Sequence, residues 1–345
     1  MAKGGGFSFF RDQLSKVPPV DKASLTGKTI LVVGANVGLG LDASKHFASM
    51  KPARLILACR SQEKGEAAMK TIEEATGFRG VELRLVDLSR FASVVEFAAK
   101  LEDEGLVLDI YVYNAGVLAV KHEESTDGWE LSLQVNALSV LLLSVLLLPS
   151  LLRAASAKPN SCPRMIIVGS EALFLAKMPK DILNSPNIMR KLNEPESFET
   201  ASMQQPRYCQ SKALTLLITR ELAARLAKTP IIAVNPHPGY CYSELRRNFG
   251  IMDRILDGLL ERLIARSTEE GSRELVWAAI GMQGREDELR GAYTNLRKVA
   301  EPSDFVISEA GQDTQKRIWG ECVEVLSEVS PAFKAIVNEH LSTGA

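Results

Sequence analysis

The first half of the chain alternates short apolar runs with amphipathic stretches, and this rhythm limits the possible folds more than any other feature. Segments with the character of strands occur at 28–33, 54–59, 81–86, 108–113 and 164–168. Helical periodicity fills the intervals, at about 39–50, 62–76, 91–104 and 130–152. Strands that alternate with helices in this way form βαβ units, so we predict an α/β fold with a doubly wound parallel sheet.

The pattern breaks between Ser170 and Arg207, where a stretch with Pro, Asn and Met leaves room for one short helix. A helix at about 206–227 and a strand at 231–235 follow. Beyond Tyr240 the sequence is mostly helical, at about 251–265, 269–279 and 314–326. Because no internal repeat or linker divides the chain, we predict a single domain.

Charge and cysteine content exclude several classes of protein. The 41 basic and 42 acidic side chains nearly balance, which argues against a general electrostatic hold on nucleic acid or anionic lipid. The 5 cysteines are scattered and odd in number, as in a reducing compartment, so we expect a cytoplasmic protein. The sequence contains no CxxC pair and no HExxH or His-x3-His pair of the kind that binds a metal, so we predict no metal site.

One segment, 135–152, approaches the length of a membrane span. It contains Asn136, Ser139, Ser144 and Pro149 and is the only segment of its kind. We therefore predict a helix buried on two sides, by the sheet and by a second subunit or another part of the chain, and no transmembrane span.

A glycine-rich turn joins the first strand to the first helix. Gly34, Gly38 and Gly40 have a GxxxGxG spacing, which lets the backbone approach a pyrophosphate at the helix N-terminus. Glycines at such junctions are often simple turn residues, and only the position in the first βαβ unit favours the binding interpretation.

The second strand ends without an acidic residue. A site for NAD usually has a carboxylate there for the ribose 2′-hydroxyl, whereas this segment ends in Arg60. Arg60 is either a solvated surface residue or a ligand of a 2′-phosphate, and we favour the phosphate because the excluding acid is missing.

Tyr208 and Lys212 are four residues apart on a predicted helix and so share a face. They are either a surface pair or a phenol whose pKa is lowered by a nearby ammonium until it can transfer a proton. Ser170 follows an apolar strand, at the edge where open α/β sheets bind ligands, although serine is also a common turn residue.

Motifs in a fixed order reveal a resemblance to the short-chain dehydrogenase/reductases, specifically the retinol-dehydrogenase-like and WW-domain-oxidoreductase-like branch found in fungi. The resemblance covers about 25–325. It rests on GANVGLG (34–40), ACRS (58–61), VDLS (86–89), YNAG (113–116), VNALS (135–139), VGS (168–170), YCQSK (208–212) and NPHPG (235–239).

The resemblance implies a single-domain Rossmann fold that binds NADP(H). It divides the chain into an N-terminal arm (1–24), a dinucleotide-binding core (25–240) with an insertion at about 171–205, and a substrate-lid and C-terminal helical part (241–345). The implied cofactor-binding residues are Gly34, Asn36, Gly38, Leu39, Arg60, Asp87, Leu88, Asn114, Ala115, Gly116, Tyr208, Lys212, Pro238, Gly239 and Ser243.

The resemblance also implies a catalytic set of Asn136, Ser170, Tyr208 and Lys212. Ser170 would polarise a carbonyl, Tyr208 would protonate the developing alkoxide, and Lys212 would lower the pKa of Tyr208. Asn136 would hold a water that relays protons. Val33 and Tyr113 depart from the family pattern, where threonine and asparagine are usual, which puts a supporting hydrogen bond of the site in question.

Together these features predict an NADP(H)-dependent oxidoreductase of lipophilic ketones or aldehydes and alcohols, with reduction favoured. The substrate would be a polyketide or terpenoid secondary metabolite, or a retinoid or other lipid carbonyl, and the insertion with the segment after Tyr240 would form a lid. The alternatives are a non-catalytic scaffold that binds the cofactor and an epimerase or dehydratase of nucleotide sugars, although such enzymes typically show a GxxGxxG turn. A homodimer through the long apolar helix is a further possibility.

Overall fold

The computed structural model describes residues 6–157, 161–198, 206–246 and 249–342, so 199–205 of the predicted insertion lie outside the described residues. Its centre is a sheet with the strand order β3-β2-β1-β4-β5-β6-β7-β8, in which only β8 is antiparallel to its neighbour. The strands are β1 Thr29–Val33, β2 Arg54–Cys59, β3 Val81–Leu85, β4 Ile110–Tyr113, β5 Arg164–Ile167, β6 Ile232–Pro236, β7 Tyr293–Asn295 and β8 Lys298–Ala300. This confirms the predicted doubly wound α/β fold.

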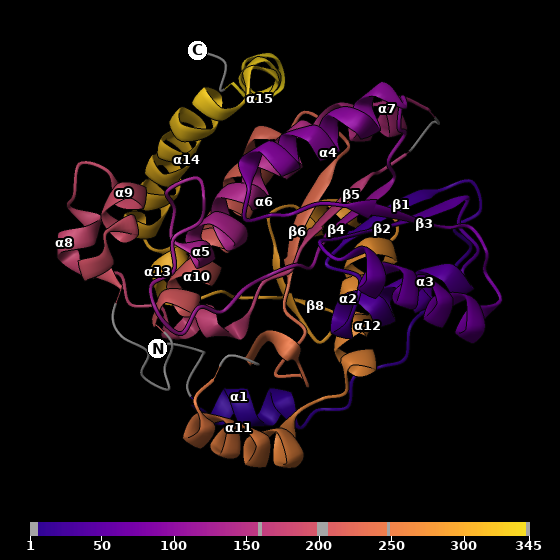
Figure 1. The fold of residues 1–345 in the computed structure, drawn as a ribbon, viewed down its shortest axis with the longest axis horizontal. Coiled ribbons are helices and arrows are strands. Elements are labelled where there is room, and N and C mark those ends of the chain that lie inside the picture. Colours follow the sequence, from indigo (N-terminus) through magenta and orange to yellow (C-terminus); the bar gives the residue numbers. More distant parts are fainter. Residues whose placement is uncertain (1–5, 158–160, 199–205, 247–248, 343–345) are drawn as a thin grey trace.

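Helices cover both faces of the sheet (Figure 1). Along β1, Leu31 and Val33 point into one apolar core and Ile30 and Val32 into the other, as the two-residue period of a strand requires. The first core lies under α4 Phe91–Asp103, α6 Ser139–Leu146 and α10 Pro206–Arg225. The second lies under α2 Gly38–Ser49, α3 Gln62–Thr76 and α12 Thr268–Ile280.

The predicted helix over 130–152 is divided in the structure. It begins with α5 Leu131–Leu133, continues through a π-helical turn Gln134–Leu138 into α6, and bends by 44° before α7 Leu148–Ala157. Pro149 explains the break, because its ring clashes with the carbonyl four residues earlier. Every residue of α6 is buried. Among the described residues, no single helix has both the length and the apolarity needed to cross a membrane, and only this bent pair approaches them.

The insertion and the C-terminal part are more ordered than predicted. Instead of one short helix, the insertion holds a 3₁₀ turn at Glu171–Leu175, α8 Lys180–Leu183, α9 Ile188–Asn193 and a 3₁₀ turn at Pro195–Ser197. The C-terminal part contains α13 Asp304–Ile307, α14 Glu309–Val329, α15 Pro331–Ile336 and a π-helical turn Val337–Leu341. α14 covers α10, and Glu321 on it accepts a hydrogen bond from the Met189 backbone of α9 at 2.8 Å.

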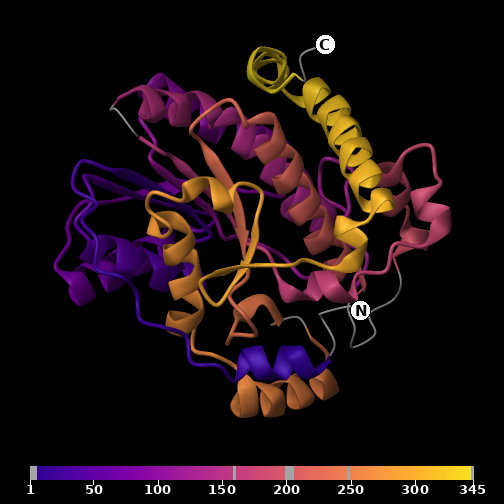
Figure 2. The same cartoon turned by 180° about the vertical axis from the view of Figure 1, so that it is seen from behind.

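Two parts of the fold were not predicted. α1 Gly6–Gln13 lies in the N-terminal arm, beside α11 Ile251–Ile264 (Figure 2). The β7–β8 hairpin extends the sheet by two strands and turns through Leu296 and Arg297, whose φ angles are 50° and 59°. Neither residue type favours a positive φ, so the sequence carries no hairpin signal there.

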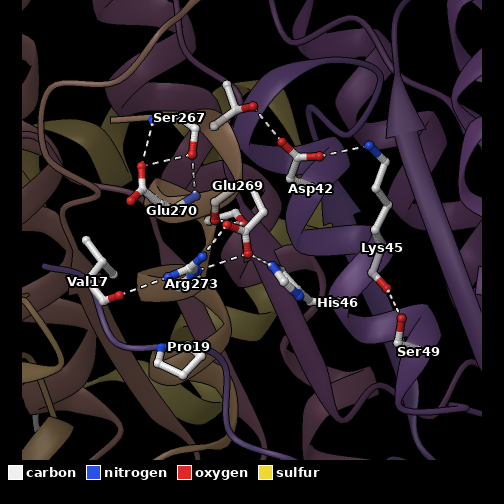
Figure 3. Close-up of polar contacts among 12 residues, drawn as sticks. Val17, Pro19, Asp42, Lys45, His46, Ser49, Ser267, Glu269, Glu270 and Arg273 are labelled. Carbon is white, nitrogen blue, oxygen red and sulfur yellow. Dashed lines mark hydrogen bonds and ion pairs between the residues drawn. The ribbon is translucent and has the colours of Figure 1, made fainter. Parts of the chain in front are cut away.

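A polar network fastens α12 to α2, the helix that follows the glycine turn (Figure 3). Asp42 accepts hydrogen bonds from Thr268 at 2.5 Å and from Lys45 at 2.9 Å. Glu269 on α12 contacts His46 on α2 at 3.0 Å and also bonds Arg273, whose guanidinium reaches the Val17 carbonyl of the N-terminal arm. α12 therefore fixes the position of α2 through the contacts at Asp42 and His46.

Gly40 in the glycine turn leaves no space for a side chain. A Cβ atom on Gly40 would lie 2.2 Å from the Gly34 carbonyl oxygen. We expect Gly40→Ala to destabilise the protein by about 1–3 kcal/mol, as overpacking does, measured by urea unfolding. Gly320 lies on α14 with open space around its Cα, so Gly320→Ala is the matched control and should be neutral or stabilising. Equal stability of both variants would contradict this packing argument.

Candidate active site

A cavity of about 1120 Å³ lies at the carboxyl ends of the parallel strands. It is lined by Gly34, Asn114, Ser170 and Pro238, which come shortly after β1, β4, β5 and β6, respectively. The register explains this convergence, because Val33 at the end of β1 lies opposite both Ala58 of β2 and Tyr113 of β4. The strands end level, so the residues that follow them meet at one edge.

All but one of the predicted site residues line this cavity. They are Gly34, Asn36, Gly38, Leu39, Arg60, Asp87, Leu88, Asn114, Ala115, Gly116, Ser170, Tyr208, Lys212, Pro238, Gly239 and Ser243. The exception is Asn136, which lies in the π-helical turn and is not part of the cavity lining.

The glycine turn forms one end of the cavity. Gly34 has φ +81°, and a Cβ on it would lie 2.7 Å from the Ala115 nitrogen, so β1 and the segment after β4 meet through their backbones. Asn114 strengthens this contact by donating a hydrogen bond to the Gly34 carbonyl at 2.9 Å. The N-cap of α2, Val37, provides no side-chain hydrogen bond, which leaves the first N–H groups of α2 to attract an anion in the cavity.

Two cations stand beside this end. Arg60 follows β2, is exposed and lines the cavity. Lys64 in the first turn of α3 lines it too, and its backbone N–H donates to Ser61, the N-cap of that helix. Sequence reasoning missed Lys64, although its place one helical turn beyond Arg60 was a usable signal. Asp87 accepts hydrogen bonds from the Ser89 backbone and hydroxyl, so its carboxylate stabilises the turn after β3.

The opposite end holds Ser170, Tyr208 and Lys212. Burial raises the pKa of Tyr208 to about 12, while a hydrogen bond with Ser170 lowers it. Burial also lowers the pKa of Lys212 to about 8, and its Nζ donates to the Val168 carbonyl at 2.9 Å. The Lys212 Nζ lies 5.9 Å from the centre of the Tyr208 ring. Desolvation therefore outweighs the expected lowering of the Tyr208 pKa.

Asn136 and Tyr113 build the wall behind these residues. The Asn136 side chain accepts from the Val117 nitrogen at 2.9 Å and donates to the Val117 carbonyl and to Ser211 on α10. Tyr113, which departs from the family pattern, donates its hydroxyl to the Val135 carbonyl at 2.7 Å. β4 is thus bonded to the π-helical turn through the Tyr113 side chain.

A further titratable residue near Ser170 was not predicted. Glu171 lines the cavity next to Ser170, and burial and Asp12 raise its pKa to about 7, whereas Arg266 lowers it. Arg266 is buried and donates to the carbonyls of Pro238, at 3.1 Å, and Asp12, at 2.5 Å. The N-terminal arm therefore contributes to the electrostatics of the cavity. No local sequence motif predicts this contribution.

Arg246 lines the cavity and bonds to α11. Its guanidinium bonds Asp257 at 2.7 Å, Glu261, and the Cys241 carbonyl at 2.9 Å. Tyr240 donates its hydroxyl to the same Asp257. These contacts hold the acidic side of α11 toward the cavity.

Comparisons with known proteins agree with this architecture. Residues 28–172 match the family model for short chain dehydrogenases. The chain is 32% identical to the short-chain dehydrogenase/reductase phmF of Phaeosphaeria nodorum over 95% of both chains, and 39% identical to the short chain dehydrogenase sol3 of Alternaria solani over 80% of this chain and 93% of that one. The fold resembles an NADPH-bound carbonyl reductase from chicken fatty liver, with a TM-score of 0.58, 20% identity, and coverage of 81% of this chain and 96% of that chain.

Glu171 makes stability depend on pH. Its pKa is raised to about 7 in the folded protein, so the folded state binds the proton more tightly than the unfolded state. This contribution to stability is present at acidic pH and is lost as pH rises toward the folded pKa. Glu171→Gln should therefore raise the free energy of unfolding more at about pH 8 than at about pH 5. Urea unfolding at both pH values measures this, with the exposed Glu324→Gln as control, and an equal change at both values would contradict it.

Proposed function

Since the chain belongs to the short-chain dehydrogenase/reductase family, we propose that it is an NADP(H)-dependent oxidoreductase that interconverts a lipophilic ketone or aldehyde with its alcohol. One observation carries the proposal: a single cavity has cations at one end, at Arg60 and Lys64, and a hydroxyl pair at the other, Ser170 and Tyr208. A substrate and a dinucleotide can therefore meet within one cavity.

The residues present fit a phosphorylated dinucleotide. The glycine turn and the uncapped start of α2 suit a pyrophosphate, because both present backbone N–H groups to an anion. Arg60 and Lys64 suit a 2′-phosphate, because both are cations that line the cavity. The described residues at the end of β2 include no carboxylate that would favour a 2′-hydroxyl instead. The bound NADPH of the structurally similar carbonyl reductase supports this preference.

When bound, NADPH supplies the hydride that adds to the carbonyl carbon. The protein supplies the proton. With a pKa of about 12, the Tyr208 hydroxyl keeps its proton at neutral pH and can donate it to the carbonyl oxygen. Ser170, hydrogen-bonded to Tyr208, is placed to hold the same oxygen.

Lys212 and Asn136 support this donor. With a pKa of about 8, Lys212 is mostly protonated at neutral pH and stabilises negative charge on Tyr208 once the proton has left. Both amide hydrogens of Asn136 are already bonded within the protein, to Val117 and Ser211. We therefore assign Asn136 a positioning role, since it ties the loop after β4 to the helix that bears Tyr208.

The substrate is proposed to be lipophilic because apolar side chains make up much of the cavity lining. They include Val117, Leu118, Val120, Leu131, Phe174, Leu175, Leu245, Phe249 and Leu260. A polyketide or terpenoid intermediate of secondary metabolism, reduced in the cytoplasm, is our first choice and follows from the family resemblance. A retinoid or other lipid carbonyl is the second.

The cofactor preference can be tested at Arg60. We expect Arg60→Ala to weaken NADPH binding about ten- to hundred-fold, the usual value of charge-assisted hydrogen bonds, and to leave NADH binding unchanged. Fluorescence titration with both cofactors measures this. Arg79→Ala removes an exposed arginine outside the cavity lining and serves as the control. A wild-type protein that prefers NADH would refute the 2′-phosphate assignment.

The proton donor can be tested at Tyr208. We expect Tyr208→Phe to reduce kcat/KM about 10²- to 10⁴-fold, because the proton donor is lost, while NADPH still binds. NADPH oxidation with a panel of lipophilic ketones measures this. Tyr242→Phe is the matched control, since Tyr242 is 42% exposed and does not line the cavity. Full activity in Tyr208→Phe would favour the alternative of a non-catalytic scaffold.

A further inference from the structure

α11 directs its acidic residues toward the protein and apolar residues outward, which is the reverse of an ordinary surface helix. Its acidic residues face the body of the protein: Asp257 and Glu261 bond Arg246, and Asp253 lines the cavity. A surface helix normally buries its apolar side and exposes its charges. The inward position of these carboxylates leaves the apolar side of α11 facing outward.

The outward side of α11 is strongly apolar. Ile255, Leu259 and Leu263 recur every four residues and therefore share one helical face. Their exposed fractions are 55%, 55% and 76%, and that of Leu260, at the edge toward the cavity, is 39%. Single exposed leucines are common, but a row along one helix is not.

The N-terminal arm extends this surface. The Gln13 side chain donates hydrogen bonds to the carbonyls of Tyr240 and Ile264, both at 2.7 Å, which attaches the end of α1 to the end of α11. Leu14, directly after α1, is 68% exposed. Figures 1 and 2 both show α1 and α11 side by side below the rest of the fold. We call Leu14, Ile255, Leu259, Leu260 and Leu263 the docking face.

The charges around the docking face are positive. Among the described side chains of α1 and α11, the exposed charged ones are Arg11, Arg254 and Arg262, and Lys16 lies just beyond α1. Arg254 and Arg262 make no ion pair with any residue that the structure describes. The near-neutral charge of the whole chain thus conceals a local excess of cations.

We propose that the docking face binds the surface of an anionic lipid bilayer, with the leucines and Ile255 in the acyl boundary and the arginines at the headgroups. An interfacial helix has this composition, with apolar residues on one side and cations at its margins. Leu260 belongs to both the docking face and the cavity lining, so the mouth of the cavity would open toward the lipid.

A second copy of the chain fits this face less well. Most homodimers have twofold symmetry, and a twofold interface places the same patch of each copy against the other. Arg254 and Arg262 would then approach the same cations of the second copy without a described carboxylate on this face to neutralise them. Anionic headgroups would neutralise them.

Co-sedimentation of the full chain with vesicles tests the proposal. The probes are vesicles of phosphatidylcholine alone and of phosphatidylcholine with phosphatidylserine. We expect the wild type to bind the anionic vesicles more tightly, and Leu259→Ser/Leu263→Ser to weaken binding about ten-fold or more, because two leucines are withdrawn from the acyl region. Arg254→Glu/Arg262→Glu should abolish the advantage of the anionic vesicles.

Leu85→Ser/Val299→Ser is the matched control, because Leu85 and Val299 are 47% and 49% exposed on the edge strands β3 and β8. It should bind vesicles like the wild type, and thermal unfolding should show all variants folded. A wild type that sediments with neither vesicle, or a leucine variant that binds normally, overturns the proposal. Failure to bind lipid together with a dimer that the leucine variant dissociates would instead assign the face to a second copy. These readouts require neither cofactor nor substrate.

Discussion

The whole cavity depends on backbone contacts at positions where no side chain fits. Gly34 lies against the backbone of Ala115, and Gly40 lies against the Gly34 carbonyl, so β1, the start of α2 and the segment after β4 touch directly. At the far end, a Cβ on Gly239 would lie 2.4 Å from the Arg266 guanidinium, which belongs to a side chain and can shift. Because packed backbone cannot yield as a flexible side chain can, Gly34 and Gly40 determine the shape of the cavity at the glycine turn.

The sequence was most informative where one local pattern decides the structure. The buried strands β1, β2, β4, β5 and β6 appear as apolar runs, and the turns after the parallel strands carry the residues that line the cavity. The apolar runs are enough to predict the fold class. Because the strands end level, the turns after them also predict that every site residue except Asn136 lines the same cavity. Arg60 was found for the same reason, since it directly follows an apolar run.

The sequence was least informative where distant residues decide the structure. α1 is held by Gln13 and by the Arg266 contact to Asp12, and neither contact leaves a periodic signal in a short arm. The β7–β8 turn uses Leu296 and Arg297 at positive φ, which the hydrogen bond from the Arg297 nitrogen to Glu274 supports. Likewise, the local pair Tyr208 and Lys212 suggested a lowered phenol pKa, but burial, a property of the whole fold, has the larger effect.

The attachment of the N-terminal arm has a consequence for the order in which the molecule is completed. Gln13 and its partner Tyr240 are 227 positions apart, and Asp12 and Arg266 are 254 positions apart. During synthesis, Asp12 and Gln13 therefore leave the ribosome long before Tyr240 and Arg266, and their contacts form only after those partners have been made. No strand pair of the described sheet uses the arm, whereas the electrostatics of the cavity beside Glu171 do involve Asp12. The arm can also detach without breaking a strand pair, so the enclosure of the cavity is less stable than the fold that carries it.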